Sequence, residues 1–206
     1  MAHSRLNTTA AALTGLCLLG ATAASAAGPV EDLQGTITSQ VGGSALAPAI
    51  QTFVQEQLLS VMNNEVFVRE LKKQNAMGRT LDEIKAIDNE WKTTEEEMDL
   101  MMELLTNAAA NEITKVFKPI AQVGEVFLMD NQGANAGLNA LTSDFWQGDE
   151  TKWQDSFNKG KGGFYVGESE LDKSTNEILQ QISLPIVDTD GTVLGAICIG
   201  IRVSSF

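Results

Sequence analysis

The sequence predicts an α+β fold in which helices come first and an antiparallel sheet follows. From Pro48 to about Val116, apolar residues recur at three- and four-residue spacing, which is the period of an amphipathic helix. Beyond Pro119 the apolar runs shorten to strand length, turn residues separate them, and one short helical pattern interrupts them. Helices followed by strands indicate an α+β architecture, whereas alternating helices and strands would indicate a parallel sheet.

Residues 1–26 have the pattern of a cleaved signal peptide. Arg5 gives the positive start, residues 8–24 carry no charge, and residues 24–26 (Ala-Ser-Ala) supply the small side chains of a cleavage site. We therefore expect a periplasmic or secreted protein that keeps no membrane span after cleavage. Residues 27–46 mix Gly, Ser, Thr and Ala with little periodicity and are expected to form a flexible N-terminal tail.

The region 47–118 is expected to be helical. A first helix runs from Pro48 through Leu71 and stops at Gly78. Residues 80–83 form a capping-box pattern that starts a second helix. A third helix is expected to begin at residues 94–97, where three acids suit the positive end of a helix, and its methionines have the spacing of core residues.

Residues 119–206 are expected to form the core of the sheet. Strands are predicted at 123–129, 164–166, 178–187 and 192–203, with a short helix between Asp149 and Gly160. A turn is predicted at 130–133. The turn at 188–191 (Asp-Thr-Asp-Gly) favours a β-hairpin, since no glutamate follows at the distance that a calcium loop requires.

The composition disfavours several classes of function. The net charge is −13, and an acidic surface repels phosphate backbones and anionic lipid heads, so no nucleic-acid partner is expected. His3, the sole histidine, lies in the predicted signal peptide, and Cys198 stands in an apolar run as a small buried residue. We expect no cofactor, no metal and no catalysis, although carboxylate-only hydrolysis through Asp144, Asp149 or Asp172 stays formally open.

The segment 142–153 (TSDFWQGDETKW) holds two of the three tryptophans and several acidic or amide groups, with no aliphatic run to bury the indoles. Such a segment is typical of a pocket wall. Asp144, Trp146 and Trp153 are its candidates for ligand contact. Two alternatives stay open, because Trp153 also fits the buried stripe of the short helix and Asp144 also fits a turn cap. The acids at 149 and 150 fit better as helix-start residues.

The C-terminal half, about residues 122–204, resembles the extracytoplasmic PAS-like sensor domains called Cache or PDC domains, in their single-module form. The resemblance rests on the runs VFLMDNQG (126–133), TSDFWQGDETKW (142–153), FYVGESELD (164–172) and ISLPIVDTDGTVLGAICIGI (182–201). The last run is the most specific, since it matches the family's closing hairpin. The resemblance implies a central antiparallel sheet with long N-terminal helices and a pocket on one face, closed by the segment between its second and third strands.

The same resemblance places the tryptophan-rich segment and residues 164–172 around the pocket. Tyr165 would add an aromatic wall, and Asp144 and Asp172 would add carboxylates. Aromatic faces with carboxylates favour an amine-bearing or cationic ligand, through cation–π contacts and charge-assisted hydrogen bonds. Tyr165 also fits the sheet core, and Asp172 also fits a cap of the segment that follows it.

Two departures from the family pattern bear on the ligand. Relatives that bind amino acids carry Arg-x-Trp in the pocket helix to clamp a carboxylate, and here these positions are Thr151, Lys152 and Trp153. Lys152 can still bind a carboxylate, as a point charge without the bidentate fork of arginine. Those relatives also place an Asp in the closing strand, where residues 199–201 are Ile-Gly-Ile.

We therefore expect a sensor module that captures a small ligand and signals through a partner protein, such as a membrane receptor or a kinase, because the chain ends shortly after the closing strand. The apolar stripe of the first helix either supplies a homodimer contact or covers the sheet. The alternative function is a non-catalytic periplasmic interaction protein with a vestigial pocket. An open cavity among Trp146, Trp153, Tyr165 and Asp172 would favour ligand binding, and side chains filling that space would favour the alternative.

Overall fold

The computed structural model describes Met1 and residues 28–172 and 177–206. In these residues the centre of the fold is a five-stranded antiparallel sheet in the order β2-β1-β5-β4-β3. The strands are β1 (Val123–Met129), β2 (Asn135–Leu138), β3 (Tyr165–Asp172), β4 (Glu177–Val187) and β5 (Val193–Arg202). The predicted α+β class is confirmed. The predicted signal peptide lies outside the described residues, apart from Met1.

The register of the three central strands sorts side chains onto two faces. Cys198 on β5 lies opposite Ser183 on β4 and Phe127 on β1. Successive residues of a strand point to opposite faces, so Phe127, Cys198 and Ser183 share one face while Leu128 and Ile197 share the other. The β4–β5 hairpin closes at Gly191, whose φ of 88° suits glycine, and this confirms the predicted turn.

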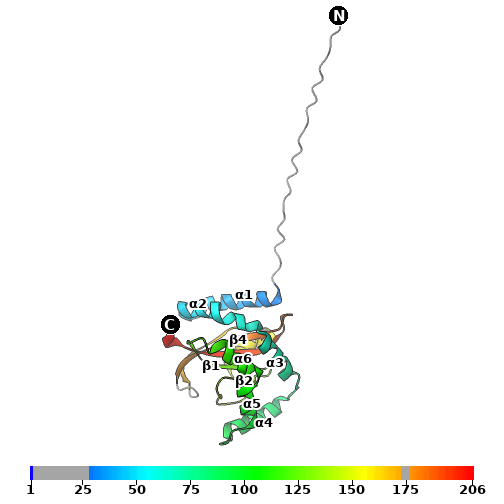
Figure 1. Ribbon diagram of the computed structural model, residues 1–206, viewed down its shortest axis with the longest axis vertical. Coiled ribbons are helices and arrows are strands. Elements are labelled where there is room, and N and C mark those ends of the chain that lie inside the picture. The colour runs from blue at the N-terminus through cyan, green and yellow to red at the C-terminus, as the bar shows by residue number, and fades with distance from the viewer. Residues whose placement is uncertain (2–27, 173–176) are drawn as a thin grey trace.

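The Leu128 face is covered by the N-terminal helices. These are α1 (Pro29–Gly42), α2 (Pro48–Phe53), a π-helical segment (Val54–Leu58), a 3-10 segment (Leu59–Asn63), α3 (Glu65–Asn75) and α6 (Ala108–Phe117). Their buried apolar side chains form one core with those of the sheet. Figure 1 shows α1 and α2 along one edge of the molecule, with α4 and α5 at the opposite end.

Helix α1 corrects the prediction of a flexible tail at 27–46. Val30, Ile37 and Val41 are buried, and Ile37 is 0% exposed. These positions follow helical spacing, but Gly, Thr and Ser between them dilute the pattern. Two of the hydroxyls bond back to carbonyls four residues earlier, so the helix accommodates them. The apolar stripe therefore outweighs the weak helix propensity of its neighbours.

The helix predicted from Pro48 is interrupted at Asn64. Its side-chain oxygen accepts hydrogen bonds from the backbone N–H groups of Val66 and Phe67 and so starts α3 as an N-cap. The apolar stripe that begins at Ile50 is buried against the sheet, which confirms the second of the two predicted roles for this stripe. The homodimer stays a prediction.

The other predicted helices are confirmed in part. The capping box at Thr80 and Glu83 starts α4 (Leu81–Thr93) as predicted. The prediction of a third helix that starts at residues 94–97 and runs on unbroken is wrong. The first helix in this region, α5 (Asp99–Thr106), begins later, and a separate helix, α6, follows it. The break lies at Asn107, whose side-chain oxygen caps α6 by accepting from Ala110 N–H.

The sheet holds one strand that the sequence pattern does not predict. Strand β2 is Asn-Ala-Gly-Leu, a run with little β propensity. It pairs with β1, and its Gly137 packs so close to α6 that a Cβ there would lie 2.5 Å from the Cβ of Ala109. Strand β3 is longer than the predicted 164–166, whereas β1, β4 and β5 match their predictions closely.

The second core lies on the Phe127 face. It joins that face to α4, α5 and Phe145, and α7 (Thr151–Phe157) with the 3-10 turn Asn158–Gly160 completes this side. The 3-10 turn Val203–Ser205 follows β5. Of the described helices, none is long and apolar enough to span a membrane.

Candidate functional site

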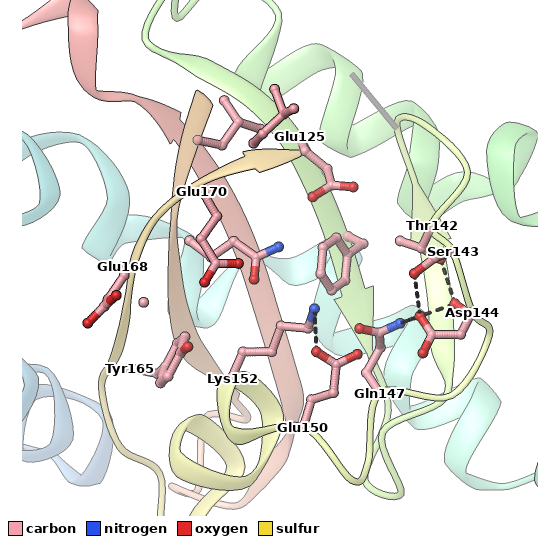
Figure 2. Close-up of a pocket in the computed structure, with 15 residues that line it drawn as sticks. Glu125, Thr142, Ser143, Asp144, Gln147, Glu150, Lys152, Tyr165, Glu168 and Glu170 are labelled. Atoms are coloured by element: carbon pink, nitrogen blue, oxygen red, sulfur yellow. Dashed lines mark hydrogen bonds and ion pairs between the residues drawn. The ribbon is translucent and has the colours of Figure 1, made fainter. Parts of the chain in front are cut away.

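A cavity of about 370 Å³ opens on the Phe127 face of the sheet. Strands β1, β3 and β4, the start of α7 and the segment 142–150 surround it (Figure 2). The pocket on one face, closed by the segment between the second and third strands, is what the family resemblance implies. The lining residues are Glu125, Phe127, Thr142, Ser143, Asp144, Gln147, Glu150, Lys152, Tyr165, Gly167, Glu168, Glu170, Leu171, Leu179 and Gln181.

The floor of the cavity comes from the alternation along β1 and β4. Glu125 and Phe127 on β1 point to the same face, and Glu125 is only 3% exposed. Gly200 on β5 lies directly opposite Glu125. A Cβ at position 200 would lie 2.9 Å from Leu179 Cδ1 and 3.4 Å from Glu125 Cβ, so a glycine here leaves room above the sheet.

Helix α4 holds the wall segment 142–150 in place. The buried carboxylate of Asp88 accepts hydrogen bonds from the backbone N–H groups of Phe145 and Trp146, each at 3.0 Å. The indole N–H of Trp91 donates to the carbonyl of Thr142 at 2.9 Å. The segment has little regular secondary structure. Side chains of the neighbouring helix therefore supply some of the hydrogen bonds that its backbone groups would otherwise make within a helix or a sheet.

Asp144 and Gln147 form one polar unit in this wall. The Gln147 amide nitrogen donates to Asp144 Oδ1 at 2.7 Å and to the Asp144 carbonyl at 3.1 Å. Gln147 is 1% exposed, and its Oε1 accepts no hydrogen bond from the described part of the protein. Figure 2 shows this oxygen on the side of the amide that faces Lys152 and Glu150, away from Asp144. Buried polar atoms are nearly all hydrogen-bonded in folded proteins, so this oxygen is an exception in the cavity wall.

Lys152 reaches into the cavity from the first turn of α7. Its ammonium lies 2.8 Å from Glu150 Oε2 and 5.2 Å from the centroid of the Phe127 ring, and its side chain is 12% exposed. Burial lowers the pKa of this ammonium, but the Glu150 and Glu125 carboxylates, with the hydrogen bond to Glu150, outweigh burial, so its pKa lies above the usual value. Lys152 is therefore charged at neutral pH.

Tyr165 also lines the cavity, from the first residue of β3. Burial raises the pKa of its phenol above the usual value, so the hydroxyl keeps its proton near neutral pH. A Cβ at Gly167 would lie 3.0 Å from this hydroxyl, so glycine leaves space beside it. Asp172 ends β3, and its side chain lies outside the described part of the structure.

The two tryptophans predicted as pocket walls lie outside the lining. Trp146 donates its indole N–H to the carbonyl of Gln132 at 2.8 Å, and Trp153 donates to the carbonyl of Asp130 at 2.9 Å. Trp153 also stacks on Phe157, with ring centroids 5.0 Å apart, which is the buried-stripe alternative. Both indoles pack against the second core. The prediction that they line the pocket is wrong, because backbone carbonyls and core contacts satisfy them.

Glu150 is a helix-start residue as predicted, and it also lines the cavity. It stands at the N-cap of α7, but its side chain makes no capping hydrogen bond and instead pairs with Lys152 in the cavity. The segment's acids could not be sorted from sequence, because a helix-start acid and a pocket acid look alike there. The sequence does distinguish Glu125, because it is the one charged residue in an otherwise apolar strand. It lies two residues from Phe127, so the two side chains point to the same face of the sheet.

The lining is strongly acidic. Of the described residues, Glu125, Asp144, Glu150, Glu168 and Glu170 contribute five carboxylates against the single ammonium of Lys152, a formal excess of four negative charges. Across the described ranges, no three His, Cys, Asp or Glu side chains are grouped so as to hold a metal ion. Buried Cys198 lies on the same face as Phe127, and burial raises the pKa of its thiol to about 12.

Comparisons with known proteins give structural neighbours only. No protein-family model matches the chain, and no curated protein sequence matches it. Solved structures similar to it include the ligand-binding domain of the Campylobacter jejuni chemoreceptor Tlp3 with 4-methylisoleucine (TM-score 0.40, 17% identity, 87% of this chain and 62% of that chain). Others are the Vibrio cholerae histidine kinase DctB sensor domain (0.42, 13%, 85% and 58%) and the ligand-binding domain of the Pseudomonas aeruginosa PAO1 amino acid chemoreceptor PctC with GABA (0.37, 14%, 68% and 58%).

The chain spans about three fifths of the length of the solved chains that it matches. At these identities and TM-scores the likeness does not establish a common family. The neighbours are sensory ligand-binding domains of chemoreceptors and histidine kinases.

Proposed function

We propose that this chain is an extracytoplasmic sensor module that binds a small amine-bearing or cationic ligand in the cavity above Phe127. The observation that carries the proposal is the pairing of an acidic lining with the buried, unused acceptor Gln147 Oε1 among the described residues. The resemblance of the C-terminal half to Cache domains supports the sensor role. In this proposal the module is non-catalytic and signals through a partner protein, such as a membrane receptor or kinase.

The charge of the lining favours a cation over an anion. Carboxylates in a partly desolvated concave site raise the local concentration of cations, and the low local dielectric strengthens each contact. The Phe127 ring adds a face for a cation–π contact. A ligand carboxylate would meet Lys152, but Glu150 already pairs with that ammonium.

The size of the cavity supports a ligand rather than a vestigial site. Ligand pockets span roughly 300–1,000 Å³, and about 370 Å³ lies at the lower end of that range. An open cavity beside Tyr165 favours ligand binding over an interaction protein with a filled pocket, although Trp146 and Trp153 do not line it. The interaction alternative would be preferred if the protein bound no small molecule while still forming a stable complex with a receptor.

A thermal-shift screen of the mature protein tests the proposal. We expect primary amines and other small cations to raise the melting temperature by mass action, and carboxylates and neutral isosteres to leave it unchanged. Asp144→Asn should weaken the shift, because asparagine keeps an acceptor for Gln147 but removes the charge. Glu56→Gln is the matched control, since Glu56 is exposed on the helical layer that covers the opposite face of the sheet.

Two outcomes would overturn the proposal. In the first, no amine or other cation stabilises the protein at any concentration tested. In the second, the amine shift is the same in the wild type, Asp144→Asn and Glu56→Gln, which would place the binding outside this cavity. Turnover of a bound amine, followed by product analysis, would contradict the non-catalytic role.

A further inference from the structure

We propose that Lys152 is an internal occupant of the cavity, and that the primary ammonium group of a ligand takes the place of the Lys152 ammonium beside Glu150 and Phe127. The inference rests on the proposed function and deepens it. It assigns the ligand-binding position within the cavity, names the chemical group that fills it, and gives Lys152 the role of a competitor rather than a ligand contact.

The geometry around the Lys152 ammonium is that of a bound cation. The nitrogen lies 2.8 Å from a Glu150 carboxylate oxygen and 5.2 Å from the centre of the Phe127 ring. Figure 2 shows the side chain extending from α7 into the cavity, with the nitrogen directed at Glu150. A carboxylate and an aromatic face are the two groups that a site for an alkylammonium ion requires.

The tethered lysine leaves one acceptor of this position unused. An ammonium group carries three N–H donors. Lys152 donates to Glu150, yet Gln147 Oε1, which is buried in the same lining, accepts no hydrogen bond from any described residue. A ligand is not tethered to α7 as Lys152 is. In this proposal its ammonium takes a position from which it donates hydrogen bonds to both Glu150 and Gln147. Such a ligand satisfies the buried amide oxygen that the lysine does not satisfy.

The exchange replaces one cation by another, so the charge of the cavity is unchanged when the ligand enters. The Lys152 side chain regains rotamer freedom as it leaves the cavity for solvent. The ligand class that fits is a primary amine on a short unbranched chain, which is the chemistry of the lysine side chain itself. Quaternary ammonium ions lack the N–H donors and fit less well.

The rival role for Lys152 is contact with a ligand's carboxylate. In that case the ligand would be an amino acid, with its amine on the acidic residues and its carboxylate on the lysine. The two roles predict opposite effects of removing the charge. A competitor, once removed, strengthens amine binding, whereas a contact, once removed, weakens amino-acid binding.

Isothermal titration calorimetry on three proteins separates the roles. The probes are n-butylamine and 2-aminohexanoic acid, and the proteins are the wild type, Lys152→Met and Lys85→Met. Methionine keeps an unbranched chain without the charge. Lys85 is the matched control, because its ammonium lies 4.8 Å from the Trp146 ring but its side chain is not part of the cavity lining.

We expect Lys152→Met to bind n-butylamine about tenfold more tightly than the wild type does. This factor applies if the Lys152 ammonium is away from the position in about a tenth of the wild-type molecules, because only those molecules can bind the amine there. Lys85→Met should bind it as the wild type does, within about twofold. Adding Gln147→Leu to Lys152→Met should remove most of the gain, since it deletes the unused acceptor. Lys152→Gln serves as a second neutral variant if Lys152→Met does not fold.

Equal or weaker binding of n-butylamine by both neutral variants of Lys152 would overturn the inference. An equal gain in Lys152→Met and Lys85→Met would also overturn it, because the effect would then be one of net charge. If 2-aminohexanoic acid binds the wild type and is lost in Lys152→Met, the lysine is a carboxylate contact, and the sensor proposal survives without this inference. If neither probe nor any other amine binds any of the proteins, both proposals fail.

Discussion

Asp88 and Phe145 lie 57 residues apart in the sequence, and the carboxylate of Asp88 accepts the backbone N–H of Phe145 at 3.0 Å. The same oxygen accepts from Trp146, and Lys92 pairs with the other oxygen at 2.6 Å. Asp88 is 4% exposed. One carboxylate thus joins α4 to the segment that walls the cavity, and the position of Asp144 and Gln147 depends on it.

Replacing Asp88 by alanine should destabilise the protein and loosen the cavity wall. Two buried N–H donors would lose their acceptor, and Lys92 would lose its nearest carboxylate, so we expect a loss of about 3 kcal/mol in the free energy of unfolding. Urea unfolding measures this loss. Amine affinity, measured at a temperature where the variant is folded, should fall as well, because Asp144 is no longer held in place.

Glu90→Ala provides the control for this prediction. Glu90 lies on the same helix, is exposed, and should change the free energy of unfolding by no more than about 0.5 kcal/mol. Equal effects of Asp88→Ala and Glu90→Ala would show that the wall segment does not depend on α4.

Trp153→Phe should separate stability from binding. Phenylalanine keeps an aromatic ring against Phe157 but cannot donate to the carbonyl of Asp130, which should cost about 1 kcal/mol. Amine affinity should stay within about twofold of the wild type, because the indole does not line the cavity. The opposite result would be an unchanged free energy of unfolding with a tenfold loss of amine affinity. It would show that Trp153 contacts the ligand in the cavity.

Much of the sheet could be predicted from sequence because its strands are apolar runs bounded by turn residues, as in β4 and β5. Strand β2 could not, since its stability comes from pairing with β1 and from close packing of Gly137 on Ala109. Helix breaks at Asn64 and Asn107 were also missed. An asparagine acts as an N-cap only when its side chain turns to the following amides, and composition does not report that orientation.

The sequence predicts some of the residues that line the cavity and misplaces others. Asp144, Lys152 and Tyr165 come together at one cavity, as expected from the resemblance. The tryptophans do not, because indoles beside polar residues suggest a pocket whether or not backbone carbonyls satisfy them. The sequence does not single out Gln147 or Asp88, since a buried amide or carboxylate among polar neighbours has no signature without knowledge of its partners.

Asp130 should make stability fall as the pH rises. Burial raises its pKa above 3.8 in the folded protein, although hydrogen bonds from Gln132, Gln74 and Ala134 oppose this. The folded state then holds the proton more tightly than the unfolded state does. Stability from this group is full below pH 3.8 and is lost as the pH rises through the raised pKa.

Urea unfolding of the wild type and Asp130→Asn between about pH 3 and 7 tests this sign. The free energy of unfolding of the wild type, minus that of the variant, should decrease with increasing pH. A difference that increases with pH would mean that the hydrogen bonds outweigh burial and that the pKa is lowered, as it is for Asp188 beside Lys72.

Gly35→Ala should stabilise the protein, because α1 is a packed helix rather than a tail. Gly35 is exposed in the helix, and a Cβ there would have nothing within 4 Å apart from its chain neighbours and the backbone of its own helix. Alanine in place of an interior helical glycine should add roughly 0.5–1 kcal/mol to the free energy of unfolding. Ile37→Ala, two residues away and 0% exposed, should remove about 2–4 kcal/mol. In a loose tail neither change would alter the unfolding curve, so two null results would contradict the helix and restore the flexible segment.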